Sequence, residues 1–293
     1  MYNNCPSCGS YNAPGTQFCD CGHALNGKSF VARQAKARNE AVLFNLLKRT
    51  SQLMMLVSAL TFAVTFPFKK SLPEVDQILE LLYSEPIQTD ADVPEPFEVH
   101  VQRESYLVTP RFYYEIYGLV VSHHHADSVT DVLHEKWDDY LNIKDICVVW
   151  GPNIQSGVYL ETTYSSGNFT CFCKFRDRAT MDRFDWTAMS NNHLLSDNVA
   201  ISRRILNADI GDQIAIRGFL SKYENARNGF KRDTSTIRTD TGNGACETIY
   251  VTDFEILKAG SFIPRLVNYV SGGLFCVALI LFLSLAFLFP KQK

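Results

Sequence analysis

The chain has 293 residues, of which 46% are apolar and 20% charged, and its formal net charge is −3. Residues 71–261 contain 17 Lys and Arg against 29 Asp and Glu, whereas the rest of the chain contains 11 basic and 2 acidic residues. An acidic centre therefore lies between basic flanks, and a long uncharged apolar run stands at each junction. This distribution excludes a simple cytosolic globule, a disordered chain and a polybasic nucleic-acid-binding protein.

Four cysteines lie within residues 1–27, in a segment with almost no apolar residues for a core. Cys5 and Cys8 form a C-x-x-C pair, and Cys19 and Cys21 follow a turn-rich stretch. Such a segment needs a cross-link to be stable, and four thiolates can provide one by binding Zn²⁺ in a tetrahedral arrangement. We therefore predict a zinc ribbon with these four ligands. The alternatives are a pair of disulfides or free thiols.

The two cysteine pairs resemble the zinc-ribbon knuckles at the N-termini of many bacterial proteins, in which CPxCG is followed by a short spacer and FCxxCG. This chain departs from that pattern because only Asp20 separates Cys19 from Cys21. His23 is therefore an alternative ligand. The segment lacks the apolar core of a secretory signal, so we expect it in the reducing cytosol. It has no Lys or Arg before Lys28, which disfavours nucleic-acid binding by the ribbon.

Two uncharged runs are long enough to cross a bilayer. Residues 28–49 are predicted to be a basic linker, helical over residues 39–47, and residues 50–68 form the first run. At 1.5 Å per residue, its 19 residues span about 28 Å, close to the hydrocarbon thickness. The second run covers residues 266–290. We predict two transmembrane helices, with a buried helix of a soluble domain as the alternative for the first.

The charges beside these runs predict an orientation. Six basic residues precede the first run and two follow it, and basic residues tend to stay on the cytoplasmic side. We therefore expect both termini in the cytoplasm of a bacterium, two spans in the inner membrane, and the acidic domain in the periplasm. In a cell with organelles, the same domain would be lumenal.

Residues 69–102 are predicted to be an acidic helix followed by a linker. Apolar residues at helical spacing predict the helix over residues 72–83, and the Pro- and acid-rich residues 84–98 are typical of a linker. Eight carboxylates lie between Glu74 and Glu98 and raise the question of calcium. The spacing and the glycine of an EF-hand are absent, which favours a solvated spacer.

Residues 103–261 are predicted to form a β-rich domain with short helices. The predicted strands cover residues 112–121, 143–150, 169–175, 210–223 and 248–257, with helical segments over 179–189 and 198–206. Three strands, a helix and two strands is the order of an OB-fold barrel. The pattern resembles the OB-like domains, related to anticodon-binding ones, of bacterial envelope proteins. The insert at residues 122–142 is long for such a barrel, so another small barrel or sandwich is the alternative.

A run of histidines in this domain is a candidate metal site. His123, His124 and His125 are followed by Asp127, His134 and Glu135, which are suitable ligands for a transition metal. Consecutive strand residues point to opposite faces, so at most His123 and His125 point together. Exposed histidines in a loop at the end of a strand are the alternative.

The cysteines of this domain suggest a disulfide. Cys171 and Cys173 are two apart on a predicted strand, which is too far for an easy mutual bond. Either could pair with Cys147 on another strand, and Cys246 could find a further partner. Buried free thiols are the alternative, and a thioredoxin-like C-x-x-C is absent.

A basic cluster precedes the last predicted strand, in the loop that often lines the ligand face of OB barrels. It consists of Arg227, Lys231, Arg232 and Arg238, next to glycines and hydroxyl side chains. We predict an anion site for a phosphate, a glycan acid or a lipid headgroup. The alternative is a flexible, solvated loop, and a Walker loop is absent.

These features favour a non-catalytic, membrane-anchored binding or assembly module of the cell envelope. The ribbon would dock a cytosolic protein partner, and the β domain would bind an extracytoplasmic ligand or protein. No catalytic motif is recognisable, so a hydrolase is a weaker hypothesis. A nucleic-acid-binding protein would need ribbon and OB face on one side of the membrane, and the negative charge opposes it. The ligand, the partner and any homo-oligomer are left open.

Overall fold

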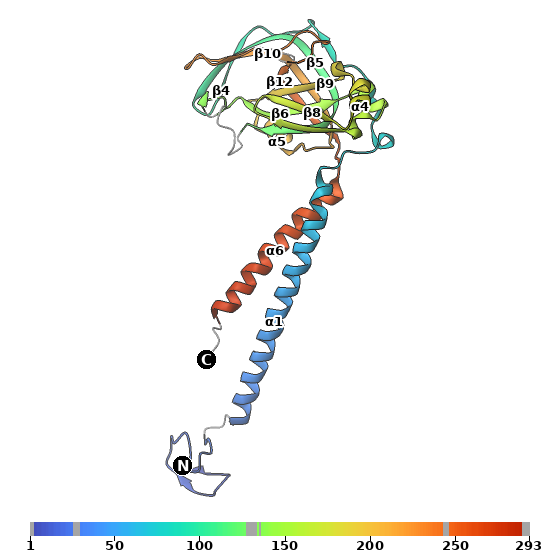
Figure 1. The fold of residues 1–293 in the computed structure, drawn as a ribbon. Helices are drawn as coiled ribbons and strands as arrows, with labels where there is room; N and C mark the ends of the chain where they lie inside the picture. Colours follow the sequence, from blue (N-terminus) through green and yellow to red (C-terminus); the bar gives the residue numbers. More distant parts are fainter. Residues whose placement is uncertain (1–2, 26–29, 127–133, 135, 243–245, 289–293) are drawn as a thin grey trace. The chain divides into compact units, whose positions relative to one another are not determined.

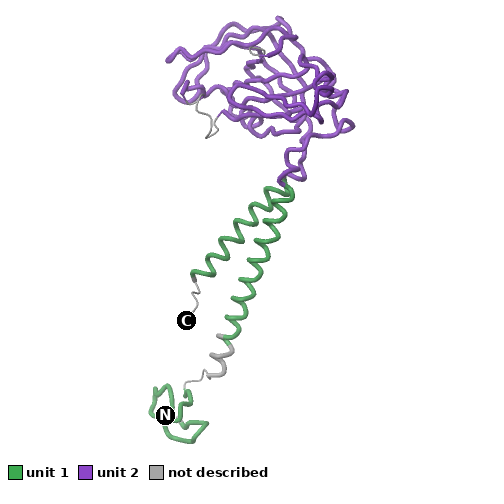
Figure 2. Tube along the Cα trace, viewed as in Figure 1, with its two compact units in different colours: residues 1–65, 266–293 green, residues 66–265 purple. Residues whose placement is uncertain are grey.

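The computed structural model describes residues 3–25, 30–126, 134, 136–242 and 246–288. It divides into two compact units, which Figure 2 shows in different colours. Unit 1 comprises residues 1–65 and 266–293, and unit 2 comprises residues 66–265. The chain therefore forms unit 2 as one continuous insertion between two segments of unit 1.

Unit 1 contains two long apolar helices, α1 (Phe30–Thr65) and most of α6 (Phe262–Leu288) (Figure 1). Both are long and apolar enough to cross a membrane. α1 is already helical at Phe30, so most of the predicted basic linker belongs to this helix. It ends two residues before Pro67, whose ring removes a backbone donor that a continuing helix would need. Lys28 and the end of the predicted second span, residues 289–290, lie outside the described residues.

A buried asparagine forms hydrogen bonds between the two helices of unit 1. Asn268 of α6 is buried, and its Nδ2 donates to the carbonyl of Phe62 (2.9 Å) and to Oγ1 of Thr65 (3.0 Å) on α1. One turn further along α6, a Cβ atom on Gly272 would lie 3.4 Å from the ring of Phe62. The two helices are therefore close together at this position.

Five strands of unit 2 pair in a closed ring. They are β5 (Glu104–His125), β6 (Asn142–Val149), β9 (Met189–Leu195), β12 (Cys246–Lys258) and β10 (Gln213–Asn225). Each pairs with the next in this order, and β10 pairs with β5. The β9–β12 pair is parallel and the other four are antiparallel. A sheet that closes in this way is a barrel.

An apolar core fills the barrel, and a helix packs against it. α5 (Val199–Asn207) connects β9 to β10 and begins at Asn198, whose side chain accepts from the backbone N–H groups of Ala200 and Ile201. Ile201 and Ile205 of this helix are buried in the core that includes Trp150. The helix therefore covers the barrel with one apolar face.

Shorter elements extend the barrel. β3 (Ile87–Thr89) and β4 (Phe97–Val101) pair with β5, and β11 (Lys231–Arg232) pairs with β10. β7 (Thr162–Gly167) and β8 (Thr170–Phe175) form a separate hairpin between β6 and β9. The other short helices and strands are α3 (Gly151–Gln155) and α4 (Arg178–Arg183) in unit 2, and β1 (Asn3–Asn4) and β2 (Tyr11–Asn12) near the N-terminus. Further 3₁₀ turns in unit 2 cover Pro67–Lys70, Val158–Glu161 and Trp186–Ala188.

The prediction that residues 169–175 are the third barrel strand is wrong. These residues form β8 of the inserted hairpin, and the third barrel strand is β9. The helical segment predicted over residues 179–189 is also shorter, because α4 ends at Arg183 and β9 begins at Met189. The sequence of β9, MSNNHLL, is polar at its centre, so it lacks the usual pattern of a buried strand.

The helix and linker predicted within residues 69–102 are also corrected. Instead of one helix over residues 72–83, there are two 3₁₀ turns, Val75–Gln77 and Glu80–Tyr83. The side chain of Gln213 holds the chain between them, accepting from Leu79 N–H (2.7 Å) and donating to the Gln77 carbonyl (3.0 Å). The predicted linker contains β3 and the start of β4.

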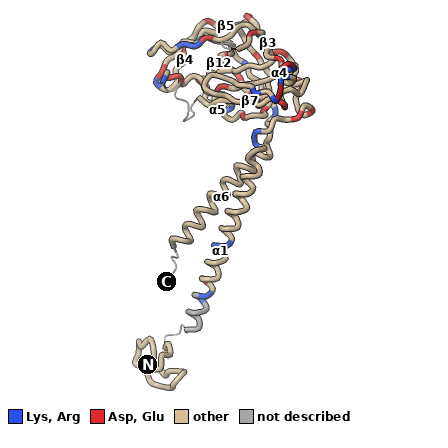
Figure 3. Tube along the Cα trace, in the orientation of Figure 1, with Lys and Arg blue, Asp and Glu red and all other residues tan. Residues whose placement is uncertain are grey.

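The charges follow the division into units. Asp and Glu are concentrated on unit 2 in Figure 3, whereas the apolar parts of α1 and α6 carry no acidic residue. The acidic balance predicted for the centre of the sequence is therefore a property of one compact unit.

Candidate functional site

The four N-terminal cysteines form a compact cluster. The sulfur atoms of Cys5, Cys8, Cys19 and Cys21 all lie within 4.8 Å of one another, which confirms the predicted grouping. The Cys5–Cys21 and Cys8–Cys19 sulfur distances are 3.6 and 3.5 Å. A tetrahedron with metal–sulfur bonds of 2.3 Å places its sulfurs about 3.8 Å apart. The four thiols therefore fit a tetrahedral metal ion.

Backbone turns bring these thiols together. Gly9 N–H donates to the Cys5 carbonyl (2.9 Å), and Gly22 N–H donates to the Cys19 carbonyl (2.7 Å). Both glycines have positive φ, which a side chain would strain. His23 is not a member of the cluster, although its carbonyl accepts from Cys19 N–H (2.8 Å). The one-residue spacing of the second pair therefore leaves four sulfur ligands in place.

A groove of about 580 Å³ lies on unit 2. Its walls come from the β7–β8 hairpin, the start of β9, and the segment between β10 and β12. The groove is lined by, among others, Phe169, Phe172, Trp186, Asn191, Arg232 and Asp240. Of the four residues predicted to bind an anion, Arg232 alone lines this groove.

Two consecutive hydrogen bonds, through buried side chains, connect Arg232 to the interior of unit 2. Its guanidinium donates to Nε2 of His193 (2.8 Å), and Nδ1 of His193 faces Oδ1 of Asp145 (2.6 Å). A guanidinium can only donate, so Nε2 is the acceptor and Nδ1 carries the proton. Asp145 and His193 are at most 1% exposed. No described carboxylate forms an ion pair with Arg232.

Burial and neighbouring groups determine the charge states of His193 and Asp145. Burial lowers the pKa of His193 and outweighs the attraction of Asp145, so the ring is neutral. Burial alone would raise the pKa of Asp145, but His193 and the hydrogen bond from Asn142 Nδ2 (2.9 Å) lower it. Asp145 therefore stays ionised, next to a neutral His193 ring that accepts from Arg232.

Phe169 covers one face of Arg232 in a strained conformation. The guanidinium carbon lies 4.1 Å from the ring centre, and Phe169 has φ of +59° in the two-residue turn between Gly167 and Thr170. That conformation favours Gly or Asn and costs a bulky residue about 1 kcal/mol. The hydrogen bond from Phe169 N–H to Oδ2 of Asp145 (3.0 Å) helps to offset this cost.

Aromatic rings support Phe169 on its other side. Trp137 stacks on Phe169 with centroids 5.7 Å apart, and Phe230 stacks on Trp137 at 5.2 Å. Together with Arg232, these rings form a continuous column from the hairpin to the segment after β10. The column fixes the plane of the guanidinium beside the groove.

The other three residues predicted to bind an anion lie outside the groove and have other partners. Arg227 pairs with Glu104 and with Asp138 (3.1 Å), and Arg238 pairs with the buried Glu247 (2.7 Å) beneath Tyr114 and Trp150. Lys231 is an exposed residue of β11, opposite Glu224. The positive charges of Arg227 and Arg238 are thus balanced within the fold.

The predicted histidine site is dispersed. His123, His124 and His125 end strand β5 instead of lying in a loop, and the rings of His123 and His125 are 5.1 Å apart. Nε2 of His123 bonds Asp209 (2.9 Å), and burial lowers the pKa of His123. Asp127 and Glu135 lie outside the described residues. Within the described part of the chain, only the cysteine cluster gathers three or more such ligands.

Of the cysteine pairings left open by the sequence, the structure has Cys147–Cys171. It joins barrel strand β6 to β8 of the inserted hairpin, next to the groove that Cys171 lines. Cys173 and Cys246 are free thiols, and burial raises the pKa of both. The disulfide therefore ties the β7–β8 hairpin to the barrel without supplying a reactive thiolate.

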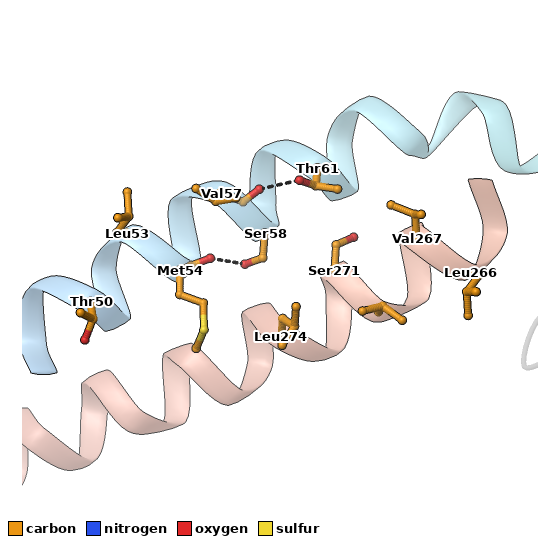
Figure 4. A pocket seen from close by; sticks show the side chains of 11 residues that line it. Thr50, Leu53, Met54, Val57, Ser58, Thr61, Leu266, Val267, Ser271 and Leu274 are labelled. Atoms are coloured by element: carbon orange, nitrogen blue, oxygen red, sulfur yellow. Dashed lines mark hydrogen bonds between the residues drawn. The ribbon is translucent and has the colours of Figure 1, made fainter. Parts of the chain in front are cut away.

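A second cavity, of about 560 Å³, lies between α1 and α6 in unit 1 (Figure 4). Ser58 and Ser271 point into the space between the helices, but each donates to a carbonyl of its own helix. Most other lining residues are aliphatic. This cavity is an apolar packing surface with satisfied hydroxyls.

Comparisons with protein-family models, curated proteins and solved structures found no match. The sequence had not singled out Phe169, His193 or Asp145 as parts of a site. The buried His–Asp pair joins strands β6 and β9, 48 residues apart, so no local motif marks it. The sequence Asn168-Phe169 is only a weak indication of a hairpin turn, since the glycine that is usual at the second position is missing.

Proposed function

We propose that this chain is a membrane-anchored binding protein of the bacterial cell envelope, and that it has no catalytic activity. α1 and α6 cross the inner membrane, both termini are cytoplasmic, and unit 2 is periplasmic. Large apolar side chains along both helices support insertion: Leu56 and Ile280, for example, are 68% and 64% exposed. The basic residues before the apolar part of α1 support the orientation.

The two kinds of cysteine site support the same topology. Free thiols that can ligate a metal suit the reducing cytoplasm, and the disulfide of unit 2 suits the oxidising periplasm. We assign the N-terminal cluster to Zn²⁺, because four thiolates in a tetrahedral arrangement are typical of structural zinc. The resulting ribbon is a docking module for a cytosolic protein.

We further propose that unit 2 is an OB-like barrel. The ring of β5, β6, β9, β12 and β10, with parallel third and fifth strands and α5 between the third and fourth, supports this assignment. The β7–β8 hairpin is then an insertion between the second and third strands. It explains why the segment before the third barrel strand is longer than in a minimal barrel.

The observation that carries the proposal is Arg232, a cation without a described ion-pair partner at the wall of a groove. Burying the Asp145–His193 pair behind it costs desolvation energy, and the arrangement fixes the guanidinium at the groove. A guanidinium held in this way is suited to an anionic ligand. Binding is favoured over catalysis because both nitrogens of His193 are engaged and its ring is fully buried.

The topology can be tested with reporters in living cells. A periplasm-active reporter inserted at Asp90, in the exposed segment after β3, should be active, and the same reporter at the N-terminus should be inactive. A cytoplasm-active reporter should give the opposite pattern. A cytoplasmic signal from the Asp90 insertion would contradict the proposed location of unit 2.

Binding can be tested with the full chain in lipid nanodiscs and three anionic probes: inorganic phosphate, methyl β-glucuronide and a short oligothymidylate. We expect at least one probe to bind, and Arg232→Gln to weaken it at least about tenfold. Arg204→Gln is the matched control, because Arg204 forms a surface ion pair with Asp253 (3.2 Å) outside the groove. If Arg232→Gln changes the binding of no probe, the groove is not the ligand site.

A further inference from the structure

We propose that the ligand of this groove is a sugar acid, namely a pyranose ring that carries one carboxylate and free hydroxyls. This inference rests on the proposed ligand-binding function of unit 2 and names the chemical class of the ligand. It is carried by the balance of charge in the groove, by its exposed aromatic rings, and by its hydrogen-bonding groups.

The charge of the groove suits a single negative charge. Arg232 is the one Lys or Arg among the described lining residues, and Asp233 and Asp240 line the groove as well. Asp233 forms an ion pair with Arg111 (3.0 Å), and Asp240 accepts a hydrogen bond from Oγ of Ser235 (2.6 Å). A phosphate dianion or a nucleic-acid strand would be repelled by these carboxylates. One ligand carboxylate can instead pair with Arg232 in the bidentate geometry that guanidinium favours.

Two exposed aromatic rings provide a surface for a sugar ring. Phe172 is 55% exposed and Trp186 is 43% exposed, and both line the groove. The C–H faces of a pyranose are apolar and pack on flat aromatic rings, which buries surface that is otherwise exposed to water. Because these rings carry no charge, their contribution is the same for a neutral and for an acidic sugar.

Polar groups beside the rings match ligand hydroxyls. Asn191 lines the groove and is only 5% exposed, and its Oδ1 has no hydrogen-bond partner among the described residues. Asp240 and Asn191 Oδ1 are acceptors, and a sugar hydroxyl is a donor that satisfies them. A phosphate ester without hydroxyls has no donor for either group. The acceptors that disfavour a polyanion therefore favour a polyol.

Phe169 and His193 fix the orientation of Arg232. The ring of Phe169 covers one face of the guanidinium and His193 accepts from one of its nitrogens. The remaining N–H edge is thereby oriented, so the site distinguishes a planar carboxylate from a neutral hydroxymethyl group. A lysine at this position would keep the charge but lose the bidentate geometry.

The test compares two sugars that differ only in the carboxylate. Full-length chain in nanodiscs is titrated calorimetrically with methyl β-glucuronide and methyl β-glucoside. We expect the glucuronide to bind at least about tenfold more tightly, which corresponds to about 1.4 kcal/mol. Arg232→Gln should abolish this preference and retain weak glucoside binding. Trp186→Ala should weaken both sugars, and Arg204→Gln should change neither.

The outcomes separate the sugar class from the proposed function. Tighter, Arg232-dependent binding of inorganic phosphate or oligothymidylate would overturn the sugar-acid inference and leave the binding function intact. Equal affinity for glucuronide and glucoside would overturn the role of the carboxylate. If no probe shows binding that depends on Arg232, both the ligand class and the proposed function fail.

Discussion

The two units hold their structure together in opposite ways. The N-terminal part of unit 1 has almost no apolar core and gathers four thiols, and a buried asparagine forms hydrogen bonds between its helices. Unit 2 has an extended apolar core and a network of buried polar side chains. In unit 1 a few contacts therefore decide the structure, whereas in unit 2 the polar contacts act on a fold that the core already stabilises.

The comparison is tested most strongly by removing the metal that we propose the four thiols bind. The described residues 3–25 have almost no apolar core, and structural zinc supplies about 10–16 kcal/mol in comparable small sites. Cys5→Ser or a strong chelator should abolish metal binding and expose the backbone amides of residues 3–25. Metal analysis and hydrogen exchange on the full chain measure both effects.

The matched control is His23→Ala, which should retain the metal because His23 lies outside the thiol cluster. The melting temperature of unit 2 should not change in either variant. A Cys5→Ser chain that still protects its N-terminal amides would show that this segment has a core after all.

In unit 2, the largest effect is expected at Asp145. Asp145→Ala leaves the Nδ1–H of His193 and the backbone N–H of Phe169 without their acceptor, and it removes one of the two partners of the Asn142 amide. Losing one partner of a buried charged network costs about 3–5 kcal/mol of unfolding free energy. Denaturant titration of the full chain should show this loss with the barrel still folded at low denaturant.

Asp233→Asn is the control for Asp145, because its ion pair with Arg111 is exposed and is worth less than about 1 kcal/mol. Equal effects of the two substitutions would contradict the assignment of Asp145 to a buried network. They would also remove the contrast between the core-poor and the core-rich unit.

These two sites also show how far the sequence can predict the structure. The cysteine cluster depends on residues 16 positions apart at most, joined by glycine turns, and the sequence predicted it. The apolar runs likewise predicted two helices that are long enough to cross a membrane. The Asp145–His193–Arg232 chain joins three elements through register, which one sequence does not encode in any local pattern.

The incorrect predictions have the same origin. The helix expected over residues 72–83 is replaced by two turns because Gln213, more than 130 residues away, bonds the backbone there. β9 was missed because its central Asn and His residues are buried by partners on neighbouring strands. Tertiary contacts override local propensity in both cases.

A smaller effect in unit 2 is a dependence of stability on pH. Burial raises the pKa of Asp139 from 3.8 to about 6, although Tyr223 donates to its Oδ2 (2.7 Å). A carboxyl whose pKa is higher in the folded state binds more protons there, so raising the pH lowers the unfolding free energy. Relative to Asp139→Asn, the parent chain should lose about 2 kcal/mol of unfolding free energy between pH 4 and pH 7.

The difference between parent and variant isolates this group, because His193 titrates in both chains with the opposite effect on stability. Urea titrations of both chains at several pH values provide the curve. A constant difference across this range would mean that Asp139 ionises in the fold as easily as in the unfolded chain, and that the buried network tolerates its charge.

The smallest effect is expected in unit 1, at the contact between its helices. Asn268→Leu removes the hydrogen bonds to the Phe62 carbonyl and to Thr65, and such bonds are worth about 1 kcal/mol inside a bilayer. The helices should separate more often, which lowers the yield of a disulfide between cysteines introduced at Phe62 and Gly272. Ser58→Ala is the control, since Ser58 bonds only its own helix. If both variants give the parental yield, apolar packing alone joins α1 to α6, and unit 1 would resemble unit 2 in depending on many weak contacts.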